Sequence, residues 1–572
     1  MRTTLFVLAA VTVTAAVAHT IPTAQNRFLD SNDVVDGRKS AFINEALLDS
    51  QGPNGESWTM LDEDFQIREF TRQNDIVYEL VRIPEFPSYQ IRVTSPQICD
   101  PTVQQYSGYF DVGDGKHLFF WFFESRDVEP SEAPVVLWMN GGPGCSSITG
   151  LMFELGPCSI ANGGKSTKLN PQSWTTHANM IFLDQPVNVG FSYSEGATVD
   201  TTPVAAHDVW VFLELFMNRY KQYSKLPFHI AAESYGGRYA PLLGAEIHKQ
   251  NKVISFAPRP FVLHINLVSV IIGNGLSDPF TQYASIPEYA CDGLSLYSMI
   301  LMAHSARRYA ASVPASLYCD SQLYGSFQQL GLNPYDVRRK CDRSKDGDLC
   351  YEQMGWIETY LNNNTIKAEL GVDSEQTFQS CNMQVNGAFT TQGDKMHNSA
   401  EALPELLAAG IRVLIYAGNA DFMCNFIGNR NWMLDLESVF QKEFTRAHLK
   451  PWKTMDGKVS GHIQSAGNKH SGAGNYTYVS INNAGHMVPY DKPEVSLDLF
   501  VRWIMDDTPR SRGQPPCLNG LCVISIWRLY RSSRWIFAIV HSQIKCFWRL
   551  LDSNRQQLFD LWSSKAWLIP HF

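Results

Sequence analysis

The 572-residue sequence lacks three features that would place it in other classes of protein. It has no excess of basic residues, since 47 Lys and Arg face 56 Asp and Glu and leave a formal net charge of −9, so a nucleic acid is not an expected partner. No group of His and Cys has zinc-site spacing, and we expect neither a metal nor another cofactor. No apolar run is long enough to be a stable membrane span, and the oligomeric state is left open.

The N-terminus predicts passage through the secretory pathway. Met1-Arg2 and an apolar stretch from Leu5 to Ala18 have the form of a signal peptide over residues 1–18, cleaved after Ala18. This route makes disulfides plausible for many of the twelve cysteines. It also makes Asn363 and Asn475, each in an Asn-X-Thr sequon, candidates for glycosylation. The expected destination is a vacuole, a lysosome-like compartment or the exterior.

Two terminal stretches differ in composition from the middle of the chain. Residues 19–97 are polar and charged, and we interpret them as a propeptide, with a poorly ordered extension as the alternative. Residues 509–572 carry five of the fourteen tryptophans and many arginines. Their longest charge-free apolar run, Trp535 to Val540, is too short to cross a bilayer. This tail is a membrane-surface segment or the product of a misjoined exon, and we expect little order in it.

Residues 98–508 alternate between strand-like and helix-like patterns. Gln105 to Val112 and His117 to Phe123 flank the turn sequence Gly113-Asp114-Gly115 and read as a hairpin. Short apolar runs, typical of buried parallel strands, alternate with amphipathic segments that include 205–220 and 240–249. The sequence therefore predicts an α/β fold with a mixed, mostly parallel central sheet. Between about 285 and 400 the alternation stops, which indicates an insertion over the edge of the sheet where such folds place their sites. The buried runs are Val135 to Met139, Met180 to Leu183, Phe228 to Ala231, Val268 to Ile272, Val413 to Tyr416 and Tyr476 to Ile481.

Ser234 follows one of these runs, in Ala232-Glu233-Ser234-Tyr235-Gly236, and a helical pattern begins just after it. A sharp strand-to-helix turn holds a serine oxygen clear of the sheet, where a histidine can take its proton. Small residues at 232 and 236 leave room for the reversal, although Ala232 stands where the common pattern has Gly.

Two other segments supply the partners for this serine. Asp421 lies just past the strand 413–416, and His486 lies in a loop after the strand 476–481. The order Ser, Asp, His is that of the α/β-hydrolase fold, so we interpret the three as a catalytic triad. The glycines of Asn140-Gly141-Gly142-Pro143-Gly144 allow successive backbone N–H groups to face one point, as an oxyanion hole requires.

These motifs resemble the serine carboxypeptidases of the carboxypeptidase Y type, from about residue 105 to 504. The resemblance implies an exopeptidase that is active at acidic pH, acts on peptide and protein C-termini, and carries its helical insertion over the active site. Its oxyanion hole would use the N–H groups of Gly142 and Tyr235. The similar stretches are Trp138 to Ser147, Phe153 to Pro157, Phe182 to Tyr193, Glu233 to Tyr235, Gly273 to Leu276, Asp421 to Asn425 and Gly485 to Pro489.

Recognition of the substrate carboxylate falls, by the same resemblance, to Trp138, Asn140, Gly141, Glu154 and Glu233. Two carboxyls within hydrogen-bond reach cannot both ionise, so the pair of glutamates holds a proton. When protonated it donates to the substrate carboxylate, and when ionised it repels it. Peptide binding should therefore weaken as the pH rises.

The resemblance also implies side-chain pockets and disulfides. Leu276, Tyr283, Met423 and Tyr235 would line the pocket before the scissile bond, and Thr149 and Met487 the pocket after it. The implied disulfides are Cys145 with Cys381 and Cys341 with Cys350, and Cys424 would be a free buried thiol. The chain departs from the family between Cys291 and Cys319, where further cysteines are usual. Cys291 would then pair with Cys319, and Cys99 with Cys158.

Two other functions use the same residues. An esterase or acyltransferase would share the triad but would not need the set Asn140, Glu154 and Glu233. A non-catalytic homologue that binds a partner would not need an intact triad. Because both sets are present, we favour the carboxypeptidase.

Overall fold

The computed structural model describes residues 57–61, 67–113, 115–290, 327, 329–347, 349–468 and 473–505. The expected signal peptide, the C-terminal tail and the proposed pair Cys291–Cys319 lie outside the described residues. In the described part of the chain, no helix combines the length and the hydropathy needed to cross a membrane.

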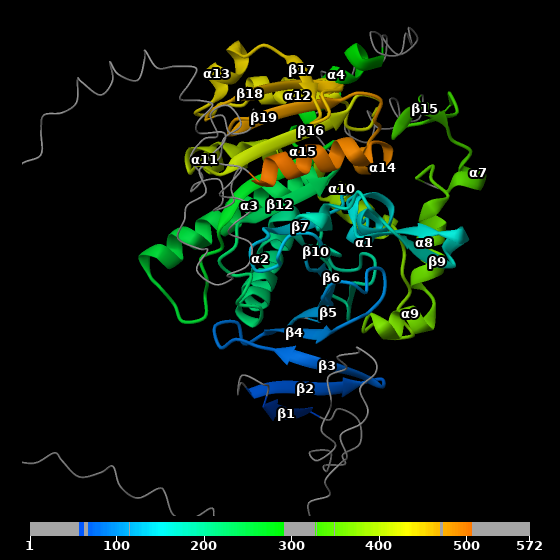
Figure 1. The fold of residues 1–572 in the computed structure, drawn as a ribbon, viewed down its shortest axis with the longest axis vertical. Coiled ribbons are helices and arrows are strands. Elements are labelled where there is room, and N and C mark those ends of the chain that lie inside the picture. Colours follow the sequence, from blue (N-terminus) through cyan, green and yellow to red (C-terminus); the bar gives the residue numbers. More distant parts are fainter. Residues whose placement is uncertain are drawn as a thin grey trace, which may run out of the picture. The chain divides into compact units, whose positions relative to one another are not determined.

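One sheet of 15 strands organises the fold (Figure 1). Its six central strands, in the order β10-β7-β12-β13-β16-β19, run parallel, and the strands on both flanks are antiparallel. This arrangement confirms the predicted α/β fold with a parallel centre. The strands are β1 (Ser57–Leu61), β2 (Ile67–Gln73), β3 (Ile76–Val81), β4 (Tyr89–Thr94), β5 (Gln105–Val112), β6 (Lys116–Phe123), β7 (Val135–Met139), β10 (Asn179–Leu183), β11 (Tyr193–Ser194), β12 (Phe228–Glu233), β13 (Leu267–Gly273), β16 (Arg412–Gly418), β17 (Lys450–Lys453), β18 (Val459–Ala466) and β19 (Tyr476–Ile481).

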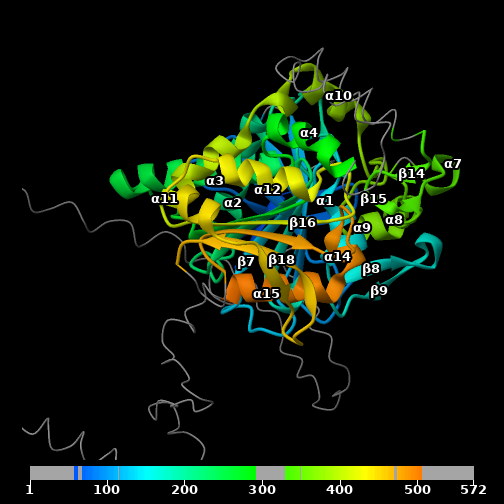
Figure 2. The same cartoon turned by 90° about the horizontal axis from the view of Figure 1, so that it is seen from above.

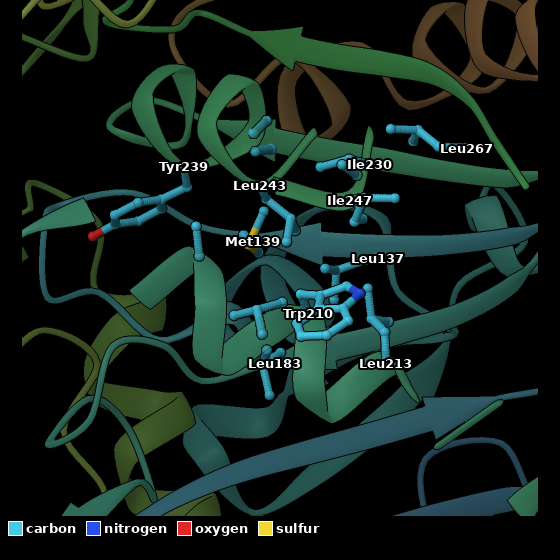
Figure 3. Close-up of a cluster of buried hydrophobic side chains, with 14 of the residues drawn as sticks. Leu137, Met139, Leu183, Trp210, Leu213, Ile230, Tyr239, Leu243, Ile247 and Leu267 are labelled. Carbon is cyan, nitrogen blue, oxygen red and sulfur yellow. The ribbon is translucent and has the colours of Figure 1, made fainter. Parts of the chain in front are cut away.

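Both faces of the central strands are buried, which explains why these strands read as continuous apolar runs. In β7, Leu137 and Met139 join one hydrophobic core, and Val136 and Trp138 join the other. The first core packs against α2 (Thr202–Arg219) and α3 (Gly236–Phe256), as Figure 3 shows for Trp210 and Leu243. The second core packs against α8 (Gln353–Leu361) and α15 (Pro493–Met505). In Figure 2, β16 lies between α12 (Phe426–Asp435) and α15.

The strands β2, β3 and β4 extend the sheet beyond β5, because β4 pairs with β5 along Tyr89 to Thr94. The buried ion pair between Arg92 on β4 and Asp111 on β5, with atoms 2.7 Å apart, fastens this extension to the rest of the sheet. A poorly ordered extension is therefore excluded for residues 67–94. Removal of residues 19–97 as a propeptide stays a prediction.

The described part of the insertion is built from short elements and is held by two of the three disulfides found among the described residues. These elements are β14 (Leu332–Asn333), β15 (Asp336–Lys340), α7 (Arg343–Asp346), α8, α9 (Asn364–Glu369) and α10 (Met383–Thr391). Cys341–Cys350 closes a small loop within it, and Cys145–Cys381 ties it to the loop after β7. The third disulfide joins Cys99 and Cys158. Cys424 is a buried free thiol.

Candidate active site

Ser234 occupies the turn from β12 into α3 with a φ of +62°. Its N–H donates to the carbonyl of Gly273 at 3.1 Å, and its own carbonyl accepts from Leu276 N at 2.8 Å. The reversal is tight, since a Cβ added to Gly236 would lie 2.5 Å from the Cβ of Ala232. A non-glycine residue in the left-handed region is held there by its surroundings, and here the turn presents a partly exposed serine at the edge of the sheet.

The parallel strands bring the other two triad candidates to the same edge. The turn with Asp421 follows β16 and the loop with His486 follows β19, and these strands are neighbours in the sheet. Both side chains are buried, and His486 Nδ1 lies 2.7 Å from Asp421 Oδ2. A carboxylate at Nδ1 fixes the imidazole tautomer and leaves Nε2 as the acceptor.

Asp421 is held by three further donors. Asn274 Nδ2 donates to its Oδ2 at 2.8 Å, and the N–H groups of Met423 and Cys424 donate to Oδ1 and Oδ2 at 2.9 and 3.2 Å. These three hydrogen bonds, together with the contact to His486, fix the orientation of the buried carboxylate. Burial and the nearby Asp421 and Glu233 raise the pKa of the Cys424 thiol well above its usual value, so this cysteine stays neutral.

The glycine loop after β7 lies directly against the Ser234 turn. A Cβ on Gly141 would stand 2.3 Å from Tyr235 N and 2.8 Å from Ser234 Cβ. Gly142 has a φ of +106°, which favours glycine. The loop thus brings the backbone of Gly141 next to the N–H of Tyr235.

Asp184, at the end of β10, anchors the far side of that loop. Its Oδ1 accepts from Ser146 Oγ at 2.5 Å and from Ser147 N at 2.9 Å. Ser147 Oγ in turn accepts from Asn140 N at 3.2 Å. Burial raises the pKa of Asp184 to about 6, although these hydrogen bonds oppose the rise.

The proposed carboxylate-binding residues form one buried hydrogen-bonded set. Asn140 Oδ1 accepts from Trp138 Nε1 at 2.7 Å and from Gly150 N at 3.1 Å. With its oxygen fixed in this way, Asn140 directs its Nδ2 toward Glu154 Oε1, 3.2 Å away. The orientation of the amide is therefore set by its neighbours before any substrate arrives.

Glu154, on a π-helical turn (Leu151–Leu155), contacts Glu233, the last residue of β12. Burial raises the pKa of Glu154 to about 7, and its hydrogen bonds with Glu233 and Asn140 limit the rise. Burial and then the charge of Glu154 raise the pKa of Glu233 well above its usual range. Both effects favour the protonated form of the pair. One oxygen of each carboxyl, Oε2, is buried and makes no hydrogen bond of good geometry with the described residues.

Five of the six pocket candidates fall into three groups. Leu276 touches the Ser234 turn. Met423 lies two residues after Asp421, in the loop that we call the acid loop, and Met487 directly follows His486, in the base loop. Thr149 lies on α1 (Ser147–Gly150), beside the glycine loop. Tyr283, on α4 (Pro279–Glu288), belongs to a separate apolar cluster with Phe422.

Tyr235, the sixth candidate, is turned into the protein. Its phenol donates to Asp394 Oδ2 at 2.6 Å, and its ring packs edge-on against Tyr239 and Phe389. The side chain is 3% exposed, so burial holds it away from a substrate in this conformation.

Several residues of the site were not singled out from the sequence. Asn274 lies in Gly273 to Leu276, a stretch that resembles the family but was assigned no role. It directly follows the buried strand β13, and a polar residue at that place is a signal for a site residue. Tyr335, whose carbonyl accepts from His486 N at 2.7 Å, lies in the insertion 151 residues before the histidine along the chain. Asp184 lies in the similar stretch Phe182 to Tyr193 but was given no role, and Asp394 and Asp491 have no local pattern that marks them.

Comparison with known proteins identifies the family of the chain. The model of the serine carboxypeptidase family matches residues 96–506. A carboxypeptidase Y homolog A from Arthroderma gypseum is 44% identical over 447 residues, 73% of this chain and 78% of that protein. Carboxypeptidase Y from Schizosaccharomyces pombe is 42% identical over 458 residues, 74% of this chain but only 44% of that longer protein.

A solved structure shows the same fold. The structure of a prohormone-processing carboxypeptidase from Saccharomyces cerevisiae superimposes with a TM-score of 0.61 at 24% identity, over 75% of this chain and 96% of that one. With the family model covering most of the chain and a relative 44% identical over 78% of its own length, the chain belongs to the serine carboxypeptidase family.

Proposed function

We propose that this serine carboxypeptidase releases residues one at a time from the free C-terminus of peptides and proteins, at acidic pH, with Ser234 as nucleophile. The observation that carries the proposal is the buried set Trp138–Asn140–Glu154–Glu233 beside the Ser234 turn. A hydrolase that needed only a triad would have no use for two protonated carboxyls at this place.

Catalysis would proceed in two steps. Ser234 Oγ attacks the last peptide carbonyl and gives its proton to His486 Nε2, while the oxyanion accepts from the N–H groups of Gly142 and Tyr235. His486 then protonates the leaving amine, and the C–N bond breaks to leave an acyl-enzyme. Water attacks this ester, gives a proton to His486, and Ser234 recovers its proton as the shortened peptide leaves. Asp421 supports the imidazolium in both steps.

Recognition of the free end would come from donors alone. The Asn140 amide, the Gly141 N–H and the protonated glutamates can all donate to a carboxylate, and Trp138 fixes the amide by holding Oδ1. An amide or an ester at the same place offers no charge to these donors.

A pair of peptides with the same sequence tests this function, one with a free acid and one with a C-terminal amide. At pH 5 the purified protein should shorten the free acid and leave the amide nearly intact. A serine-directed phosphonylating reagent should stop the reaction and should label the wild type but not Ser234→Ala. Equal rates on both peptides would contradict carboxylate recognition, and ester cleavage without peptide cleavage would favour the esterase.

The compartment and the modifications belong to the same proposal. The signal peptide together with three disulfides supports a secretory route that ends in an acidic vacuole or outside the cell. Asn363 caps α9, where its Oδ1 accepts from Thr365 N and leaves Nδ2 for a glycan. Asn475 is half-buried at the start of β19. Mass spectrometry before and after removal of N-glycans would report both sites.

A further inference from the structure

A turn of the insertion, Asn333 to Val337, lies between the loop that carries Asp421 and the loop that carries His486. It connects β14 with β15, and the acid and base loops come from β16 and β19. None of its residues belongs to the triad, the oxyanion hole or the carboxylate-binding set.

The turn forms backbone hydrogen bonds with the acid loop. The carbonyl of Pro334 accepts from the N–H groups of Phe422 and Met423, at 3.1 and 3.3 Å. Val337 N donates to the carbonyl of Ala420 at 3.0 Å. Asp421 is thus flanked on both sides by residues that are bonded to the insertion.

The turn contacts the base loop just as directly. The carbonyl of Tyr335 accepts from His486 N at 2.7 Å, and the two rings lie 5.3 Å apart. Gly485 fits closely here, since an added Cβ would stand 2.3 Å from Tyr335 O and 2.9 Å from Asp336 Cβ. The position of the imidazole therefore depends on the position of residue 335.

The guanidinium of Arg338 links the insertion turn to the loop that carries His486. Its Nε and Nη2 each donate to Asp336 at 2.7 Å, and Nη2 also donates to Asp491 Oδ2 at 3.0 Å. Asp491 Oδ2 accepts from Gly485 N at 2.6 Å, one residue before the histidine. Nη1 donates to the carbonyl of Asn483 in the same loop.

Arg339 contacts the same two carboxylates, Asp336 at 3.0 Å and Asp491 at 3.2 Å, and its guanidinium lies over the rings of Tyr351 and Tyr490. Both carboxylates are almost completely buried, with side chains 0% and 3% exposed. Buried acidic groups this close together need cations to be stable as a pair. The two arginines meet that need from the solvent side.

We propose that Arg338, supported by Arg339, is a positioning residue that holds His486 in register with Asp421 by clamping the insertion turn to the histidine loop. The inference rests on the proposed function, because it assigns a role within the same triad. It predicts that the insertion contributes to the chemical step as well as to the shape of the substrate site. A displacement of about 1 Å at a reacting group can cost about 100-fold in rate.

The test compares Arg338→Gln and the double variant Arg338→Gln/Arg339→Gln with Lys345→Gln. Lys345 lies in the same insertion and pairs with Asp342 at 2.9 Å, but its side chain is 80% exposed, so its loss should leave activity unchanged. The expected result is a kcat lowered up to about 100-fold for peptide and ester substrates alike, with KM little changed. Labelling of Ser234 by the phosphonylating reagent should slow in proportion.

Two measurements separate this role from a loss of folding. Thermal unfolding should show that the variants are folded at the assay temperature, and Arg338→Lys should recover part of kcat by reaching one carboxylate. In an Asp491→Asn background, Arg338→Gln should have a smaller effect than in the wild type, since part of the effect of Arg338 passes through Asp491. A folded double variant with the kcat of the wild type would overturn the inference, whereas an inactive wild type would overturn the proposed function instead.

Discussion

Glu233 lies against Glu154 within hydrogen-bond reach, although β12 and the π-helical turn that carry them are 79 residues apart in sequence. Burial raises the pKa of Glu154 to about 7, and burial with the nearby Glu154 raises that of Glu233. For an acid, a raised pKa means that the neutral form persists to higher pH. The pair therefore donates to a substrate carboxylate below about pH 7 and loses this ability as the pH rises through that value.

The first prediction concerns KM. For a peptide with a free C-terminus, KM should rise steeply above about pH 7, while KM for a neutral ester should change much less. Initial rates between pH 4 and 8.5 on both substrates would measure this difference. Glu154→Gln is the matched variant, because its amide stays neutral and can still donate. Its KM for the peptide should vary less with pH, and an unchanged rise would assign the pH dependence to another group.

The second prediction concerns the acid of the triad. Asp421→Asn keeps the shape of the side chain but favours the wrong imidazole tautomer, so kcat should fall roughly 10⁴-fold. Asn274→Ala removes one of the donors to Asp421 and leaves the carboxylate in place, so its loss should be smaller, about 10- to 100-fold. Steady-state kinetics at pH 5 would rank the two. Equal losses would mean that Asn274 touches the reaction itself.

Much of this site could be predicted because it depends on local patterns. The apolar runs at 135–139 and 476–481 coincide with β7 and β19, and parallel strands must place Ser234, Asp421 and His486 at one edge. The residues at strand ends were therefore accessible to reasoning from the sequence.

The parts of the site that the sequence did not predict depend on contacts between segments that are distant along the chain. Nothing near Tyr335 or Arg338 indicates that they meet a loop about 150 residues away, since a polar turn of this kind usually faces solvent. The strands within 67–94 were missed for a related reason. Arg92, for example, is buried in an ion pair, and a polar composition hides that burial.

The third prediction concerns the close contact of the glycine loop. A methyl group on Gly141 would meet Tyr235 N at 2.3 Å and the carbonyl of Glu233 at 2.7 Å, so Gly141→Ala should push the loop from the Ser234 turn. Loss of one oxyanion donor alone costs about 10²–10³ in kcat, and we expect at least that loss.

Gly355, in the first turn of α8, is the control for Gly141. No atom lies within 4 Å of a Cβ at this position, so Gly355→Ala should keep full activity and raise the free energy of unfolding by about 0.4–1 kcal/mol. Kinetics and urea unfolding of both variants would separate the two effects. A Gly141→Ala protein with normal kcat would show that the loop is not part of the reaction.

The last prediction compares two disulfides that enclose very different lengths of chain. Cys145–Cys381 joins residues 236 apart, and Cys341–Cys350 joins residues 9 apart. If disulfides act by restricting the unfolded chain, replacing both cysteines by serine should lower the free energy of unfolding by about 5 kcal/mol for the first pair and about 2–3 kcal/mol for the second. Urea unfolding measures the difference.

The effect on kcat should be small for the first pair even though Cys145 lies in the glycine loop. Two backbone hydrogen bonds flank this disulfide, Ser146 N to Ser380 O at 2.9 Å and Asn382 N to Gly144 O at 2.7 Å, and they hold the same segments together in the folded state. A large fall in kcat with little change in stability would mean that the covalent bond, and not this backbone pairing, sets the position of the loop.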